Sequence, residues 1–265
     1  MKKTAIIYLY KEDEYTILNL DFFIKTLKKN NDCDYYLIIN NHICSLTIPE
    51  FFNITKQEND FDFQSYKKFL NNKNLQNYDF FYFINSSCIG PFLPVYCEKN
   101  WYEYTNKFLE EYDLIGPVAE VPPKEKKFTE NPFIHTYMFG LNKNSYIIFL
   151  ELLNKFKELD KTACIFFERF LSFEILKNNL KIKSFLSLFS KIDLNDKKNW
   201  NSELWNNSEL SCYEIPNNYF GIDLNPYEII FVKNIRNVNE HRSEENSGIS
   251  KNLFYQIKNY KNWLI

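Results

Sequence analysis

Glycine is scarce in this chain. Only five glycines occur among the 265 residues, at Gly90, Gly116, Gly140, Gly221 and Gly248. Their spacing allows neither the GxGxxG turn of dinucleotide-binding domains nor the GxxxxGK[ST] loop that cradles phosphates. Both of these nucleotide-binding classes are therefore excluded.

Histidine and cysteine are also too few and too scattered for the usual metal or redox motifs. The three histidines have no zinc-ligand spacing, and no two of the six cysteines form a CxxC pair. Neither chain order nor a local signature indicates a Ser-His-Asp or Cys-His arrangement. We expect free thiols in a reducing compartment, because a chain of this length does not need disulfides to hold a core.

Long apolar runs and an excess of one charge are likewise lacking. The apolar start of the chain ends at the charged residues 11–14 and is too short for the core of a signal peptide. No run approaches the roughly 18 apolar residues of a membrane span. The 32 basic and 34 acidic residues give a net charge of −2, which argues against a strongly basic nucleic-acid binder. We expect a cytoplasmic protein that binds no nucleic acid and makes at most peripheral contact with a membrane surface.

Apolar and aromatic residues, in contrast, are abundant. They include 26 Phe and 19 Tyr, and apolar residues make up 45 % of the chain, so it can bury a large core. We expect one domain over residues 1–249, followed by a helical tail over 250–265 that packs on it.

Strand-like and helix-like patterns alternate over the first half of the sequence. Short apolar, β-branched or aromatic runs predict strands at 4–10, 35–40, 51–55, 79–84, 113–116, 133–141, 181–186 and 228–232. Helical spacing of apolar residues predicts helices at 14–29, 64–71, 99–111, 143–158 and 163–178. The polar segments 120–132 and 190–210 are predicted to be loops. This alternation predicts the α/β class with a mostly parallel sheet flanked by helices.

The most informative segment follows the strand predicted at 79–84. That strand shows no alternation, so we expect it to be central and covered on both faces. It leads into Asn85, Ser86 and Ser87, and then into the Gly90-Pro91 turn. Ligands of open α/β sheets bind outside the carboxyl ends of the strands, which makes these three polar residues candidates for a binding site.

Two sequence blocks carry a resemblance to a known family. They are NSSCIGPFLP at 85–94 and GIDLNPYEIIFVKNIR at 221–236, and shorter similarities occur at 8–12, at Asn19 and at 57–66. The chain resembles GT-A glycosyltransferases over roughly residues 4–236, and more narrowly a bacterial and giant-virus group with these two blocks. The resemblance implies a GT-A-like domain with a Rossmann-like central sheet. It also implies a nucleotide-diphosphate sugar, with UDP as the nucleotide, lying across the strand ends.

The chain departs from that family at the metal-binding position. Many GT-A enzymes hold a divalent cation on a strand-terminal D-x-D, where this chain has Asn85-Ser86-Ser87. Neutral oxygens are poor anchors for Mg²⁺ or Mn²⁺, so we expect a weak or absent metal, with Asn85 and Ser87 as its ligands if one binds. Literal D-x-D strings occur at 32–34, before a strand, and at 60–62, at a helix entry, and neither is interpreted as the metal site.

Donor-binding residues are proposed from the resemblance and from their chemistry. Lys233 and Arg236 follow a predicted strand and suit a departing phosphate, although solvated surface cations are the more common role of such residues. The remaining donor-site candidates are Tyr8, Tyr10, Asn59, Asp62 and His135. A tyrosine ring at a strand end can stack a uracil and a carboxylate can bind a ribose, while ordinary core packing is the alternative for both tyrosines. For His135 the alternative is a hydrogen-bonded residue of the core.

Sugar transfer with inversion requires one general base. The similar group has a Glu before a short apolar-Ser run, which Phe166–Ser172 matches, so Glu168 is the candidate base and Glu174 the second choice. The alternative is an exposed helical Glu168 paired with a neighbouring cation.

The sequence therefore predicts a glycosyltransferase that moves a sugar to a hydroxyl of a glycan or a lipid-linked glycan, as in polysaccharide biosynthesis. Three alternatives stay open. The first is a non-catalytic nucleotide-sugar or glycan-binding domain on the same fold. The second is a nucleotidyltransferase or methyltransferase, against which the lack of a glycine-rich loop argues. The third is a scaffold role through the 250–265 tail.

Overall fold

The computed structural model describes residues 2–27, 30–120, 131–190, 192–201 and 223–234. The strands are β1 (Thr4–Lys11), β2 (Cys33–Asn40), β3 (Phe52–Gln57), β4 (Phe80–Asn85), β5 (Cys88–Ile89), β6 (Leu114–Gly116), β7 (Ala119–Glu120), β8 (Phe133–Ile134), β9 (Met138–Asn142), β10 (Ile182–Ser184) and β11 (Val232–Lys233). The α-helices are α1 (Glu14–Thr26), α2 (Asp62–Asn71), α3 (Trp101–Leu109), α4 (Lys143–Lys155), α5 (Lys161–Lys177) and α6 (Pro226–Ile229), and 3₁₀ turns span Ser187–Ser190 and Lys197–Asn201.

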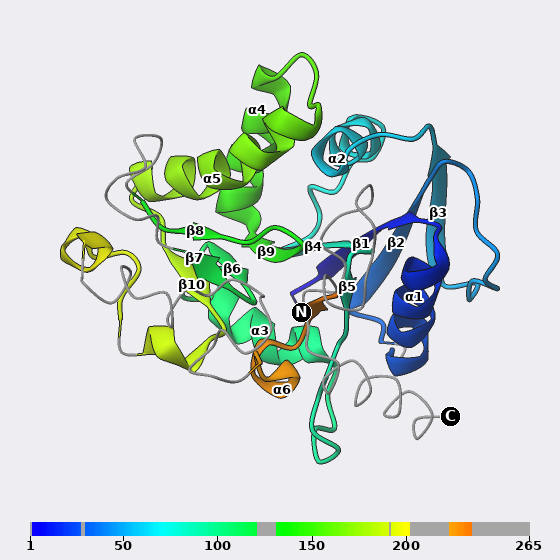
Figure 1. The fold of residues 1–265 in the computed structure, drawn as a ribbon, viewed down its shortest axis with the longest axis horizontal. Coiled ribbons are helices and arrows are strands. Elements are labelled where there is room, and N and C mark those ends of the chain that lie inside the picture. The colour runs from blue at the N-terminus through cyan, green and yellow to red at the C-terminus, as the bar shows by residue number, and fades with distance from the viewer. Residues whose placement is uncertain (1, 28–29, 121–130, 191, 202–222, 235–265) are drawn as a thin grey trace.

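Seven strands form the central sheet, in the order β10-β6-β9-β4-β1-β2-β3 (Figure 1). Only β9 runs antiparallel to its neighbours β4 and β6, and the other neighbouring strands pair in parallel. The predicted α/β class with a mostly parallel, Rossmann-like sheet flanked by helices is therefore confirmed.

Helices cover both faces of this sheet. In Figure 1, α2, α4 and α5 lie on one side, and α1 and α3 lie on the other. Alternate residues of β4 serve the two layers, because Phe83 packs on Tyr66 of α2 while Tyr82 packs on Trp101 of α3. All six residues of β4 are buried. The absence of alternation in this strand thus reflects its position between two helical layers.

Several helices begin where a side chain caps their free N–H groups. Asp13 accepts hydrogen bonds from the backbone N of Tyr15 and Thr16, and Thr16 completes a capping box at the start of α1. Asn142 caps α4 in the same way. These caps fix the helix starts close to the positions that the sequence predicts.

The strand predicted at 133–141 is wrong as a single strand. The structure forms β8 and β9 there, separated by residues 135–137. β8 pairs with β7 outside the main sheet, whereas β9 inserts between β4 and β6. The apolar run is continuous because both strands are buried, and the break depends on pairing partners that are distant in sequence.

The strand predicted at 228–232 is also corrected. Asn225 caps the short helix α6, which has Pro226 at its first turn, and Ile230 ends it with φ 65°. Strand β11 follows and pairs with β5 in a separate two-stranded sheet. The helix-start signal Asn-Pro outweighs the β-branched composition at this point.

The two sequence blocks that carried the family resemblance lie side by side. Phe92 N donates to Ile230 O at 2.8 Å, and Asn234 N donates to Ser87 O at 3.1 Å. Gly90 lies at the crossing with φ +157°, and a Cβ there would be 2.5 Å from Ile230 O. Glycine is required at this position because the two backbones approach too closely for any side chain.

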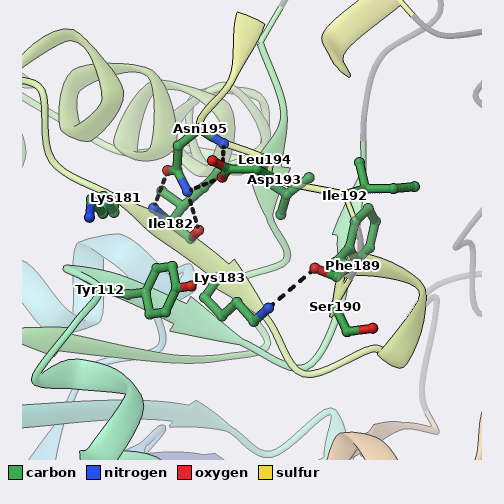
Figure 2. A pocket seen from close by; sticks show the side chains of 10 residues that line it. All are labelled: Tyr112, Lys181, Ile182, Lys183, Phe189, Ser190, Ile192, Asp193, Leu194 and Asn195. Atoms are coloured by element: carbon green, nitrogen blue, oxygen red, sulfur yellow. Dashed lines mark hydrogen bonds between the residues drawn. The ribbon is translucent and has the colours of Figure 1, made fainter. Parts of the chain in front are cut away.

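One side chain covers the free edge of the sheet at β10. Asn195 Oδ1 accepts from Ile182 N at 2.7 Å, and its Nδ2 donates to Ile182 O at 3.2 Å (Figure 2). The amide therefore occupies backbone groups that an edge strand would offer to another chain.

Some predictions lie outside the described residues. These are most of the 120–132 loop, the end of the 190–210 loop, the 250–265 tail with its domain boundary, and Arg236. Within the described part, no helix has both the length and the apolar character needed to cross a membrane.

Candidate functional site at the strand ends

The polar segment after β4 is tied to the start of α2. Asn85 ends β4, and Asp62 opens α2. Asn85 Nδ2 donates to Asp62 Oδ2 at 2.7 Å, while Asn85 Oδ1 accepts from Ser87 N at 3.0 Å and from the Ser87 hydroxyl. The Asn85 amide thus joins a strand end to a helix start and leaves the second oxygen of Asp62 for other partners.

Charged side chains from three other elements, β1, α5 and β11, act on Asp62. Burial raises its pKa, and the Glu168 carboxylate raises it further, while the Asn85 hydrogen bond, Lys233 and Lys11 act in the opposite direction. We call Lys11, Asp62, Asn85, Glu168 and Lys233 the strand-end cluster. It contains two carboxylates and two ammonium groups at the carboxyl ends of β1 and β4, where ligands of open α/β sheets bind.

Lys233 reaches the cluster through β11. It is opposite Cys88 in the β5–β11 pair, and its Nζ is 5.9 Å from the centre of the Tyr137 ring. Asn234 follows it and exchanges two amide hydrogen bonds of 2.8 Å with Asn19 of α1. Asn19 also donates to Ser86 O at 2.9 Å. The buried Asn19 therefore fastens both sequence blocks to α1, a role that its place in the family resemblance did not reveal.

Glu168 faces the segment between β8 and β9. Its Oε2 accepts from both the backbone N and the hydroxyl of Thr136, each at 2.7 Å. Ser172, one turn later on α5, accepts from Ile134 N at 3.0 Å. No described residue hydrogen-bonds to Glu168 Oε1, so this oxygen is available to a ligand. The alternative, a pairing of Glu168 with a neighbouring cation, is not found within residues 2–27, 30–120, 131–190, 192–201 and 223–234.

Glu174 points elsewhere on the same helix. Its Oε1 is 3.6 Å from Lys177 Nζ, in an ion pair one turn along α5. It is six residues from Glu168 and does not share its face, as the helical spacing predicts.

His135 lies between two side chains of the small β7–β8 sheet. Its Nε2 is 3.5 Å from Glu120 Oε2, and its ring stacks on Phe133 with centroids 5.5 Å apart. Its backbone N donates to Val118 O at 3.0 Å. These contacts favour the alternative in which His135 is a residue of the core.

Tyr8 and Tyr10 are corrected as stacking platforms. Both rings are buried, at 1 % and 0 % exposure. Tyr8 packs on Phe23 of α1 with centroids 4.8 Å apart, and the Tyr10 hydroxyl donates to Glu12 at 3.1 Å. The alternation of β1 places them on the α1 face of a central strand, so neither ring presents a face to a nucleobase. Core packing explains both.

The remaining candidates lie in the loop between β3 and α2. Asn59 is exposed there. Its neighbour Asp60 accepts from Lys68 Nζ at 2.6 Å, and its backbone exchanges two hydrogen bonds with the Asn40 amide, at 2.6 and 3.0 Å. Asn40 ends β2. This buried residue therefore fixes the loop. The sequence analysis did not single it out, although a polar residue at the end of an apolar run is a signal that could have found it.

The residues of the site fit a divalent cation poorly. The described part of the chain holds no group of three His, Cys, Asp or Glu side chains suited to a metal. Asn85 Oδ1 already accepts from Ser87, and Lys233 and Lys11 act on the one carboxylate beside it. Hard cations require several free oxygen ligands and gain nothing from adjacent ammonium groups.

Two cavities lie away from the strand-end cluster. One, of about 310 Å³, lies beside β10 between Tyr112, Lys183 and the 189–195 segment (Figure 2). There the Lys183 ammonium donates to Phe189 O at 3.2 Å, so its charge is already engaged. The other, of about 350 Å³, lies between β3 and α2.

Two solved structures resemble this chain at a distance. No family model and no curated protein matches this sequence. A "putative nucleotide-diphospho-sugar transferase" from Desulfovibrio desulfuricans G20 is 12 % identical, with a TM-score of 0.40, over 69 % of this chain and 80 % of its own. A 4-diphosphocytidyl-2C-methyl-D-erythritolsynthase from Anaerococcus prevotii DSM 20548 is 14 % identical, with a TM-score of 0.41, over 75 % of this chain and 95 % of its own. At these values, no conclusion about this chain follows from either.

Proposed function

We propose that this protein is a GT-A-like glycosyltransferase that uses a nucleotide-diphosphate sugar, with UDP as the nucleotide. The observation that carries the proposal is the strand-end cluster. There the Asn85 amide holds the Asp62 carboxylate, on which Lys233, Lys11 and Glu168 act, at the edge of the sheet where open α/β folds bind their ligands.

The cations of the cluster suit the diphosphate of the donor. Lys233 and Lys11 supply positive charge. The hydroxyls of Ser86 and Ser87, which follow the end of β4, can donate hydrogen bonds to the phosphate oxygens. Asp62, held by Asn85, is placed to accept from a hydroxyl of the ribose or of the sugar. Arg236 would add a third cation in the same block.

The reaction we propose is a single displacement. The Glu168 carboxylate takes the proton of the acceptor hydroxyl while that oxygen bonds to the anomeric carbon of the sugar. The bond from this carbon to the phosphate oxygen breaks, and the nucleoside diphosphate leaves with the electron pair on the opposite face. Thr136 fixes Glu168 through Oε2, which directs Oε1 to the acceptor.

We propose that a metal is not needed for this reaction. Lys233 and Lys11 take the place of the cation in neutralising the leaving group. The acceptor is a hydroxyl of a glycan or of a lipid-linked glycan, reached by peripheral contact with a membrane surface.

One observation favours a second function, a non-catalytic domain that binds a nucleotide sugar or glycan. The two hydrogen bonds from Thr136 give Glu168 a structural role that needs no catalysis. In that case the donor binds at the strand ends, but no sugar is transferred to an acceptor or to water.

The test is release of UDP from a panel of UDP-sugars, with and without Mn²⁺, by wild type, Glu168→Gln and Glu174→Gln. The proposal predicts turnover by wild type and Glu174→Gln and its loss in Glu168→Gln, with donor binding retained. Donor binding without turnover in every protein supports the binding domain instead.

A further inference from the structure

The cavity between β3 and α2 has the form of a ligand site. Its volume of about 350 Å³ falls within the range of small-molecule sites, roughly 300–1,000 Å³. We call it the lateral pocket. It is lined by His42, Thr55, Lys56, Gln57, Glu58, Lys68, Phe69, Asn72 and Lys73. None of these residues belongs to the strand-end cluster.

The charge of the lateral pocket is mainly positive. Three lysines and His42 face a single lining carboxylate, Glu58, whose Oε1 is 3.4 Å from His42 Nε2. Lys68 is paired with Asp60, at 2.6 Å. Lys56 and Lys73 have no ion-pair partner among the described residues. Two uncompensated ammonium groups at one cavity repel each other, and an anion between them would remove that repulsion.

A buried donor points to the same class of ligand. Gln57 Nε2 is inaccessible to solvent and finds no hydrogen-bond acceptor among the described residues. Buried amide donors are normally paired, because an unpaired one loses its hydration without compensation. Gln57 ends β3 and lines the pocket together with Lys68 and Phe69 of α2. A rotation of its side chain toward the pocket would let a bound oxyanion supply the missing acceptor.

We propose that the lateral pocket binds a small anionic ligand that carries phosphate or carboxylate groups, at a site separate from the strand-end cluster. Lys56 and Lys73 supply the charge, Gln57 donates a hydrogen bond, and Phe69 closes the inner wall. The proposal does not depend on the glycosyltransferase function.

Calorimetric titration with inorganic pyrophosphate and, separately, with citrate tests the site. Wild type is expected to bind at least one of the two probes, which identifies the phosphate or the carboxylate class. The double variant Lys56→Gln/Lys73→Gln is expected to lose about tenfold or more in affinity. Lys107→Gln, an exposed lysine of α3, is the matched control and should change nothing. An affinity that is equal in the double variant and the control overturns the proposal.

Two further arms separate the lateral pocket from the strand ends and from effects on folding. The proposed diphosphate site at the strand ends would also bind pyrophosphate, so the titrations are repeated with saturating UDP, which occupies that site. Binding of the probe to the lateral pocket should remain in the presence of UDP and in Lys233→Gln. Complete loss of probe binding in the presence of UDP would show that the pocket is part of the nucleotide site and would refute a separate one. Gln57→Leu should weaken binding without lowering the melting temperature, because it removes an unpaired buried donor. Unchanged binding with a lower melting temperature would assign Gln57 a structural role only.

Discussion

The strand-end cluster and the lateral pocket lie at the same edge of the sheet but use charge in opposite ways. In the cluster, charges of both signs act on Asp62, and Asn85 holds this carboxylate in place. In the lateral pocket, Lys56 and Lys73 have no counter-ion in the described part of the chain. Mixed charges held by neighbours suit proton transfer to and from a bound substrate, whereas uncompensated charges of one sign suit the retention of an anion.

The sharpest way to separate the two regions is to remove the proposed base. Glu168→Gln should lower kcat by about 10²–10⁴-fold, since that is the usual contribution of general base catalysis. The KM for the donor should change little. Gln keeps the Thr136 hydrogen bonds as an acceptor, so the fold should be retained. Steady-state kinetics measures this, and an unchanged kcat would remove Glu168 from the mechanism.

A second variant disturbs the backbone that positions Lys233 in the strand-end cluster and leaves the lateral pocket unchanged. Gly90→Ala places a Cβ 2.5 Å from Ile230 O, which should lower the free energy of unfolding by about 1–3 kcal/mol. The β5–β11 pair that carries Lys233 should loosen first. Denaturant unfolding gives the stability, and pyrophosphate binding in the lateral pocket should persist. A variant as stable as wild type would contradict the close approach.

A third variant removes one charge from the cluster. Lys233→Gln should weaken UDP binding by about tenfold, because one charge-assisted contact with the diphosphate is lost. The matched variant Lys73→Gln, in the lateral pocket, should leave UDP affinity unchanged. Calorimetry with UDP measures both, and equal losses in the two variants would mean that only the general charge of the protein matters.

A smaller effect is expected on the pH dependence of the protein's stability, through the titration of Asp62. Burial raises its pKa above the value of 3.8 for a free side chain, so its neutral form is favoured in the folded state. The neutral form of Asp62 makes its full contribution to the free energy of unfolding below pH 3.8. This contribution is lost as the pH rises through the pKa of Asp62 in the folded protein. Asp62→Asn, which does not titrate, should therefore gain stability relative to wild type as pH rises above 3.8. Thermal melts from pH 3 to 8 test this, and a constant difference between the two proteins would contradict it.

The central strands were predictable because local sequence determines them. β1, β2 and β4 each contain a continuous apolar run, and most of their residues are buried, which is the pattern of strands covered on both faces. The division of 133–141 depended on partners far away in the chain, β4 and β6, whereas the helix at 226–229 follows from the local Asn-Pro start signal, which the predicted strand at 228–232 left out.

In the candidate site, too, the residues could be predicted from local sequence, whereas the contacts between distant segments could not. Asn85 was identified from its place at a strand end, Asp62 from a carboxylate at a helix entry that suits a ribose, and Lys233 from a sequence block that packs against β5. The bonds from Thr136 to Glu168 and from Asn19 to Asn234 join segments whose proximity only the fold creates. Tyr8 was misassigned because an aromatic residue near a strand end has the same local sequence whether it faces a ligand or a helix.

The most direct test of the account is a crystal structure of the protein with UDP, soaked in the presence of a chelator. The account predicts the diphosphate within hydrogen-bond distance of Lys233 and of a serine hydroxyl at the end of β4, with no metal required. UDP bound at another place on the molecule, or bound only after Mn²⁺ is added, would contradict it.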